Sequence, residues 1–100
     1  MGNPMWSYLE ALQNFAYILI VQDNKKLAME LYEERSYQKL EEYIEAKRNV
    51  FSEKEWFYYA GMASERTLNR IYKEDGNDAF NAACGGLRMF DEFIGLMEDE

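Results

Sequence analysis

Ser52 and Glu55, with their apolar neighbours, mark the start of a helix in two independent ways. Their spacing allows the backbone N–H of Glu55 to donate to the Ser52 hydroxyl, and the backbone N–H of Ser52 to donate to the Glu55 carboxylate. Phe51 and Trp56 flank the same boundary at the spacing of a hydrophobic staple. Because both devices agree on one boundary, the sequence predicts a helix over 53–73, around which the rest of the chain is arranged.

Similar signals recur along the whole chain and predict an all-α protein. Apolar residues return every three or four positions, strong helix formers dominate, and only one proline is present. The expected helices cover 4–22, 25–35, 37–49, 53–73 and 79–97. We therefore expect a single bundle-like domain of four to five helices over residues 1–100, with the acidic end 98–100 frayed.

The first helix should lie at the heart of the core. Its apolar residues cover most of its circumference, which is typical of a helix that is buried or used at an interface. We expect the first and the last helix to enclose the helix over 53–73 between them. Asn3 and Pro4 form the predicted start of the first helix. Asp23-Asn24 either separates it from a second helix or lies inside one continuous helix.

Three segments that contain glycine carry structural predictions. The clearest turn is 75–78, with Gly76 in the left-handed conformation that ends a helix. Gly61 belongs to a strip of small residues over 60–64, which would allow close approach of another backbone. The glycine pair at 85–86, inside the last helix, indicates either a kink or a second close approach.

The charge balance narrows the classes of partner. Nineteen Asp and Glu against eleven Lys and Arg give a net charge of −8. Nucleic-acid backbones and anionic membrane surfaces both attract cationic proteins, so we expect no direct nucleic-acid binding and no membrane binding. The longest apolar segment, 15–21, is also too short to cross a bilayer. A basic protein would be attracted instead, unless the charge only keeps a small domain soluble.

The residue types that most catalytic and metal sites need are missing. The chain has no histidine, which removes His-based acid–base catalysis, the usual nucleophile pairs and the common zinc sites. No phosphate-binding glycine loop is present. Cys84 has no partner for an internal disulfide and is expected to be a small core residue, which suits a cytoplasmic location. We therefore predict no catalytic residue, no metal ligand and no cofactor.

The aromatic content is the feature most informative about function. Eight tyrosines, six phenylalanines and two tryptophans exceed what a core of this size needs. Tyr, Trp, Met and Arg are enriched at protein interfaces, and exposed tyrosines among carboxylates would suit a basic partner. The candidate partner-binding residues are Tyr58, Tyr59, Glu33, Glu34, Glu41, Glu42 and Glu45.

Charge pairs within the helix over 37–49 carry a local prediction. Glu41 and Glu45 lie about one turn apart and repel each other. The offsetting contacts are expected to be Glu45 with Arg48 and Tyr43 with Lys47. Neighbouring carboxylates elsewhere leave open a carboxylate-based active site, although adjacent helical residues point about 100° apart and form no ready-made clamp.

Part of the chain resembles a known family. The matching residues are Leu40-Glu41, Ile44-Glu45, Phe51-Ser52, Glu55, Phe57-Tyr58 and Leu68-Asn69-Arg70-Ile71-Tyr72, which are similar to the Hha family of small helical proteins that bind nucleoid proteins. The resemblance covers about a third of the chain, needs a gap of one helical turn, and leaves the family's basic residues unmatched. It implies a small helical protein that binds a DNA-associated protein, and we assign the chain to no family on this basis.

The leading functional hypothesis is a non-enzymatic, cytoplasmic protein that binds a basic partner. Such a protein would be an inhibitor, an immunity-type protein or a phage-type regulator of a nucleic-acid-binding protein, and imitation of nucleic-acid charge is one means open to it. The runner-up is a self-associating module, in which the broad apolar surface of the first helix forms a homodimer interface. The third hypothesis is a small carboxylate-based enzyme or ligand binder.

Overall fold

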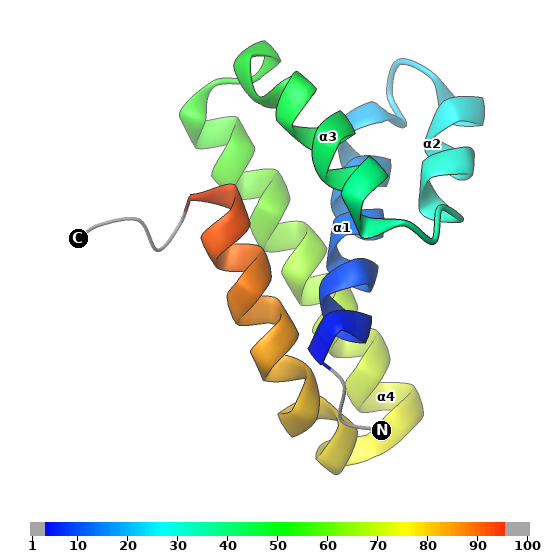
Figure 1. Cartoon of the computed structure of the whole chain (residues 1–100), viewed down its shortest axis with the longest axis vertical. Coiled ribbons are helices and arrows are strands. Elements are labelled where there is room, and N and C mark those ends of the chain that lie inside the picture. Colours follow the sequence, from blue (N-terminus) through cyan, green and yellow to red (C-terminus); the bar gives the residue numbers. More distant parts are fainter. Residues whose placement is uncertain (1–3, 96–100) are drawn as a thin grey trace.

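The computed structural model describes residues 4–95 and is built from helices (Figure 1). Its elements are α1 (Pro4–Ile20), α2 (Lys25–Tyr32), α3 (Tyr37–Lys47), the 3₁₀ turn η1 (Arg48–Val50) and α4 (Glu53–Ile94). No strand occurs within this part of the chain. The predicted all-α, bundle-like fold is therefore confirmed.

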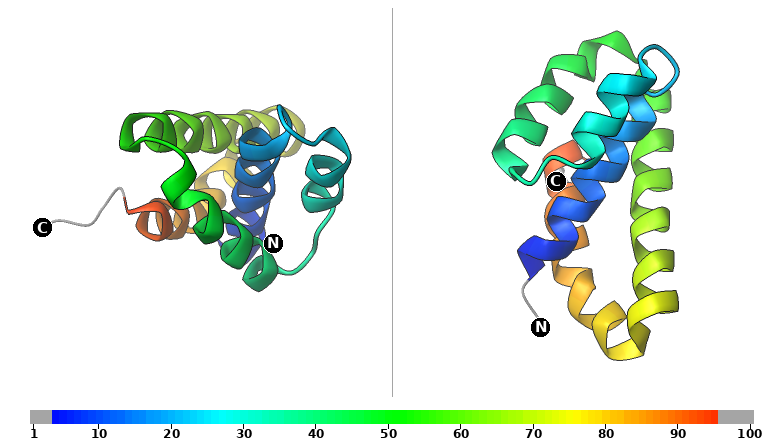
Figure 2. Two further views of the ribbon diagram at one scale, coloured as in Figure 1. Left: turned by 90° about the horizontal axis from the view of Figure 1, so that it is seen from above. Right: turned by 90° about the vertical axis from the view of Figure 1, so that its right-hand side faces the viewer.

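The long helix α4 folds back on itself at Gly76. This residue has φ 92° and ψ −178°, whereas the rest of α4 keeps helical backbone angles. The two arms, 53–75 and 77–94, run antiparallel beside each other in the views of Figures 1 and 2. The predicted turn at 75–78 is confirmed and is tighter than expected, because only the glycine leaves the helical conformation. Gly76 has the expected positive φ, but its ψ is extended, so it does not adopt the predicted left-handed helical conformation.

α1 packs against both arms of α4. The Phe15 ring lies 4.9 Å from the Trp56 ring of the first arm and 5.5 Å from the Phe90 ring of the second, measured between centroids. The buried apolar residues of α1 are Tyr8, Ala11, Leu12, Phe15, Ala16, Ile18, Leu19 and Ile20. The predicted central place of α1 is confirmed. The arrangement differs from the expected sandwich because α1, apolar around most of its circumference, contacts both arms at once.

α2 and α3 cover the remaining sides of α1 and have little direct contact with α4 (Figure 2). The buried residues through which they pack are Ala28 of α2 and Leu40 and Ile44 of α3. Their sequences alternate these apolar positions with charged ones, so each helix buries one face and leaves the other in water.

Side-chain caps fix where three of the helices begin. The Ser52–Glu55 capping box is present, with hydrogen bonds of 3.0 Å from the Ser52 N–H and 3.1 Å from the Glu55 N–H. Asn24 accepts from the Leu27 N–H at 3.0 Å, so the alternative of one continuous helix through 23–24 is wrong. Ser36 caps α3, as predicted.

Two buried hydrogen bonds align α1 with the two arms. The Asn14 side-chain amide donates to the Thr67 hydroxyl of the first arm at 2.8 Å. The Ser7 hydroxyl donates to the backbone carbonyl of Ala83 in the second arm at 3.0 Å. Buried polar groups that are paired in this way favour one rotation of a helix over its neighbours, so these bonds help to determine which residues of α1 face outward.

The glycines outside the turn have different roles from those expected. Gly61 is exposed, and a Cβ added there would meet no atom within 4 Å, so this glycine permits no close contact. The close packing of that strip belongs to Ala60 and Ala63, which are buried. At 85–86 the helix is not kinked, and Gly86 is buried, which agrees with the alternative of close approach.

Pro4 is the first residue of α1, as expected. Asn3, the predicted last turn up to Met97 and the acidic end 98–100 lie outside the described residues. Within 4–95, no helix is both long enough and apolar enough to span a membrane.

Candidate interaction surfaces

The predicted carboxylates of α3 do not all face outward. Glu42 and Glu45 are exposed, and neither forms an ion pair with a cation in residues 4–95. Glu41 points toward α1 and accepts a hydrogen bond from the Tyr8 hydroxyl. Burial and this contact raise the pKa of Tyr8 well above the usual value for tyrosine. Glu41 therefore joins two helices, whereas Glu42 and Glu45 remain available for a partner.

Arg48, which was expected to pair with Glu45, contacts other groups. Arg48 lies over the Trp56 ring at 5.2 Å and donates to the backbone carbonyl of Ile94 at 2.9 Å. The expected Glu45–Arg48 pair is wrong because the chain tightens into η1 at this point, and because a carbonyl in the last turn of α4 needs a donor. The expected contact between Lys47 and Tyr43 is present, with the ammonium group 5.7 Å from the ring centroid.

The two carboxylates at the end of α2 differ in the same way. Glu33 is exposed and follows the last residue of the helix. Glu34 accepts hydrogen bonds from the backbone N–H groups of Arg35 at 2.9 Å and Ser36 at 3.1 Å. The Glu34 side chain therefore stabilises the connection between α2 and α3.

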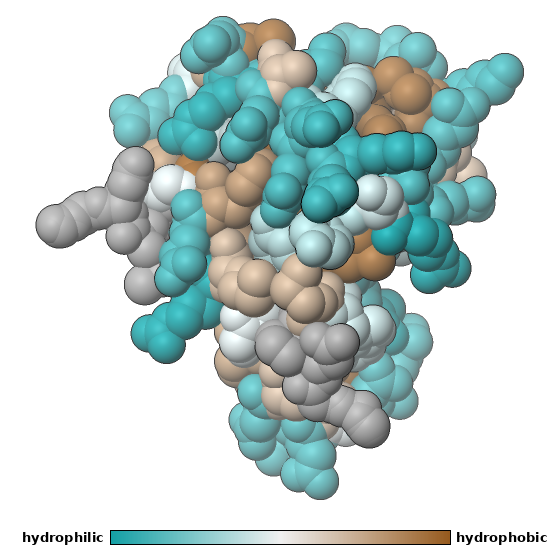
Figure 3. All heavy atoms as spheres, viewed as in Figure 1, coloured by the Kyte–Doolittle hydropathy of each residue, from teal (hydrophilic) through white to brown (hydrophobic). Residues whose placement is uncertain are grey.

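The predicted tyrosines lie in the second turn of α4. Tyr58 is 65% exposed, and its ring contacts that of Tyr59 edge-on at 5.5 Å. Tyr59 is partly buried and contacts the Phe51 ring at 5.8 Å. The seven predicted residues therefore do not converge on one site. Hydrophilic side chains lie over much of α3 in Figure 3. Glu42 and Glu45 are the exposed glutamates of this helix.

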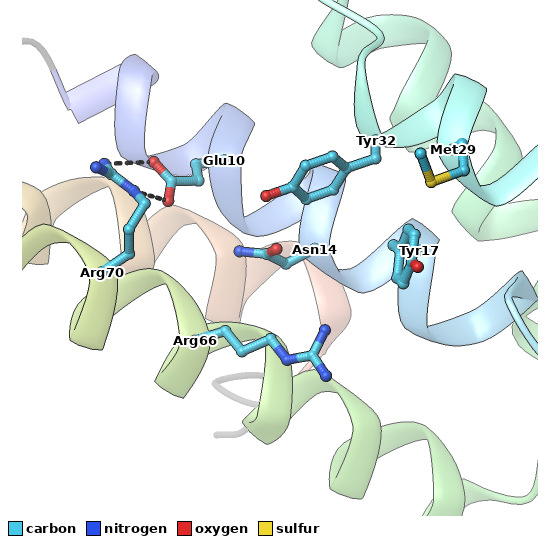
Figure 4. Close-up of a pocket in the computed structure, with 7 residues that line it drawn as sticks. All are labelled: Glu10, Asn14, Tyr17, Met29, Tyr32, Arg66 and Arg70. Atoms are coloured by element: carbon cyan, nitrogen blue, oxygen red, sulfur yellow. Dashed lines mark hydrogen bonds and ion pairs between the residues drawn. The ribbon is translucent and has the colours of Figure 1, made fainter.

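A cavity that the sequence did not predict lies between α1, α2 and the first arm of α4 (Figure 4). Its volume is about 430 Å³. It is lined by Glu10, Asn14 and Tyr17 from α1, by Met29 and Tyr32 from α2, and by Arg66 and Arg70 from α4. We call it the Tyr17–Tyr32 cavity, because these two rings meet edge-on at 5.5 Å across the α1–α2 contact.

Large apolar side chains stay exposed around this cavity. Met29 is 46% and Tyr32 is 47% exposed. A neighbouring cleft of about 330 Å³ is also lined by Tyr32. It extends to Trp6, which is 45% exposed. Three of the large exposed apolar side chains in residues 4–95 therefore gather on one side of the molecule.

The two arginines of the Tyr17–Tyr32 cavity differ in whether a carboxylate pairs with them. Arg70 forms two hydrogen bonds to Glu10, one of them 2.8 Å long, and also lies 3.2 Å from Glu74 and 3.5 Å from Asp75. These carboxylates, Glu10 above all, raise the pKa of Arg70. Arg66 is exposed and forms no ion pair or hydrogen bond within the described chain. Arg66 is therefore the free cation of the cavity.

Asn14 supplies a polar group at the back of the cavity. Its side chain is 6% exposed, and the amide nitrogen is already bonded to Thr67. The amide oxygen accepts no hydrogen bond from the described residues. Within 4–95, every side-chain oxygen or nitrogen that is fully enclosed has a hydrogen-bond partner. The Asn14 amide oxygen has none, so it is not fully enclosed, and we infer that it is accessible from the cavity that Asn14 lines.

Cys84 is exposed, and the expectation that it is a core residue is wrong. The buried positions of the second arm are Ala83, Leu87 and Phe90, and Cys84 follows the first of them, about 100° around the helix. Its thiol lies 3.5 Å from the backbone carbonyl of Phe80. In the described residues, no group of three or more Cys, Asp or Glu side chains is placed to hold a metal ion.

No family model, no curated protein and no solved structure matches the chain. The resemblance to the Hha family gains no support from these comparisons.

Proposed function

We propose that the protein is a non-enzymatic interaction module that binds a basic protein through the outer face of α3. The observation that carries the proposal is that Glu42 and Glu45 are exposed without an intramolecular cation. They lie three positions apart, so both project from one side of the helix. A cationic surface could therefore pair with both at once.

The use of the protein's own cations supports this proposal. Arg70 is surrounded by three carboxylates, Arg48 binds Trp56 and the Ile94 carbonyl, and Lys47 lies over Tyr43. These are three of the eleven Lys and Arg residues, and the net charge of −8 makes the overall field of the molecule negative. Such a field attracts basic proteins over a distance set by the ionic strength.

The partner class that best fits this charge is a nucleic-acid-binding protein, whose basic surface would accept carboxylates in place of phosphates. The protein would then act as an inhibitor or a regulator by occupying that surface. We place this activity in the cytoplasm, which agrees with the exposed free thiol of Cys84.

The homodimer hypothesis has less support than the acidic-surface proposal. It relied on the broad apolar surface of the first helix, and most of that surface packs against α2, α3 and both arms of α4, although Trp6 stays exposed.

The test is a salt-dependent pull-down with a pair of matched variants. The first variant, Glu42→Gln with Glu45→Gln, removes the two free carboxylates of α3. The control, Glu65→Gln with Glu92→Gln, removes two exposed carboxylates of α4 and changes the net charge by the same amount. Each bait is incubated with lysate of the source cells at low and at high salt, and the retained proteins are identified by mass spectrometry.

The proposal predicts a basic protein that is retained at low salt by the wild type and the control, is lost with the α3 variant, and is released at high salt. Equal loss with both variants would mean that only net charge matters, and the α3 site would be wrong. Retention that does not depend on salt would contradict a charge-directed contact altogether.

A further inference from the structure

We propose that the Tyr17–Tyr32 cavity binds a small planar anion, namely an aromatic ring that carries one carboxylate or phosphate group and an N–H donor. This site is separate from Glu42 and Glu45 on α3, and it does not depend on the function proposed above. Its volume of about 430 Å³ lies within the range of roughly 300–1,000 Å³ that is usual for ligand sites.

The walls of the cavity suit a flat ring. Tyr17 and Tyr32 come from different helices and meet edge-on, with an angle of 68° between their planes. Met29 and Tyr32 keep about half of their surface exposed, although each is large and mostly apolar. Aromatic faces and thioether groups both make favourable contacts with a ring, so a planar ligand would cover surface that is now in water.

The anionic group is specified by Arg66. The cavity holds two arginines, but the carboxylate of Glu10 already neutralises Arg70. Arg66 has no such partner in the described residues, and in Figure 4 its side chain extends along the wall opposite Tyr32. A guanidinium group binds carboxylate and phosphate through paired N–H donors. A cationic ligand would be repelled, and an anion would gain these paired hydrogen bonds, so we infer that the ligand carries an anionic group.

Asn14 is the reason why we expect the ligand to carry an N–H donor. Its amide oxygen opens onto the cavity with no hydrogen bond from the described residues, and its amide nitrogen is held by Thr67, which fixes the orientation of the group. An acceptor that is already oriented adds specificity, because a ligand without a donor would leave it unpaired. The Tyr32 hydroxyl points toward the same end of the cavity in Figure 4.

Two probes represent the two anions of this class. Adenosine 5′-monophosphate carries a ring, an N–H donor and a phosphate, and indole-3-acetate carries a ring, an N–H donor and a carboxylate. Adenosine alone and inorganic phosphate alone serve as fragments. Each is titrated into the 100-residue protein, and the NMR signal of the Met29 methyl group is followed as a reporter inside the cavity.

We expect at least one probe to shift the Met29 signal to saturation and the fragments to bind more weakly. Arg66→Gln should weaken binding of that probe by about tenfold or more, because a hydrogen bond to a charged group is lost. Arg88→Gln, which removes an exposed arginine from the second arm, is the matched control and should leave binding unchanged.

The probe that binds decides between phosphate and carboxylate. No shift at about 5 mM with either probe would overturn the proposal, since a Kd near 1 mM would be visible there. Equal weakening by Arg66→Gln and Arg88→Gln would also overturn it, because attraction by overall charge would then explain the binding. Both substitutions are on exposed side chains, and circular dichroism confirms that each variant is folded.

Discussion

Tyr8 of α1 donates a hydrogen bond to Glu41 of α3, and this contact places a carboxylate against a buried phenol. The Tyr8 ring also meets Tyr37 at 6.1 Å and Phe93 of the second arm at 6.5 Å. One side chain therefore links α1, α3 and α4. Glu41, one of the predicted partner-binding residues, is therefore engaged inside the molecule.

This contact predicts that Tyr8 stays protonated in strongly alkaline solution. Burial and the negative charge of Glu41 both raise its pKa in the folded protein. The absorbance of tyrosinate near pH 10.5–11 (about half a unit or more above the usual tyrosine pKa) should therefore be equal for folded wild type and Tyr8→Phe. A wild-type absorbance that is higher by one tyrosinate would show that Tyr8 ionises normally.

The same shift sets a direction for stability against pH. The unfolded chain releases the Tyr8 proton near pH 10, whereas the folded protein retains it, so the stabilising effect is complete below about pH 10 and is lost as the pH rises further. In urea unfolding, wild type should lose stability above about pH 10 faster than Tyr8→Phe does. Parallel curves for the two proteins would contradict the assignment.

The charge of the Asp91 carboxylate is expected to destabilise the folded protein. It is partly buried, forms no ion pair in the described residues, and burial raises its pKa. A raised folded pKa means that the group favours folding only while it is protonated, so its charge opposes folding at neutral pH. Asp91→Asn should therefore raise the urea midpoint at pH 7, and the gain should shrink as the pH falls through the raised folded pKa and should be gone below about pH 4, the usual pKa of an aspartate. Asp78→Asn, on an exposed residue, is the control.

Substitutions of Thr67 test how much its hydrogen bond with Asn14 of α1 contributes to stability. Its hydroxyl accepts from Asn14 and donates to the Ala63 carbonyl at 2.9 Å. Thr67→Val keeps the shape but leaves the Asn14 amide without an acceptor, which should lower the free energy of unfolding by about 1–3 kcal/mol. Thr67→Ser keeps the hydroxyl and removes one methyl group, at a cost of about 1 kcal/mol. If the valine variant were the more stable of the two, the hydrogen bond would not contribute as proposed.

The parts of the fold that could be predicted from the sequence are those determined by residues close together in the chain. Ser52 and Glu55 complete a capping box three residues long, and Gly76 makes the only reversal within α4. The central place of α1 could be predicted as well, because a helix that is apolar on most sides has nowhere else to lie.

The cavity could not be predicted in this way, because its members come from three elements. Asn14, Tyr32 and Arg66 meet only after α1, α2 and the first arm have taken their relative rotations. In the sequence, Arg66 and Arg70 are both ordinary charged residues of a helix, and nothing local indicates that only one of them will be neutralised. Cys84 and Glu41 were misplaced for a similar reason, since each lies one helical step from a residue of the opposite burial.

Substitution by alanine should change the free energy of unfolding in opposite directions at Gly61, in the first arm of α4, and at Gly76, in the turn. Neither Gly61 nor Gly76 has an atom within 4 Å of an added Cβ, so the substitution tests the backbone alone. Gly61 has helical angles, and Gly61→Ala should stabilise the protein by roughly 0.5–1 kcal/mol, because alanine is the better helix former. Gly76 has φ 92°, which side chains rarely adopt, and Gly76→Ala should cost about 1–3 kcal/mol. Urea unfolding of both variants measures the difference. If Gly76→Ala were as stable as wild type, the hairpin would be able to reverse without this backbone conformation, and the arms would have to be joined by a different turn.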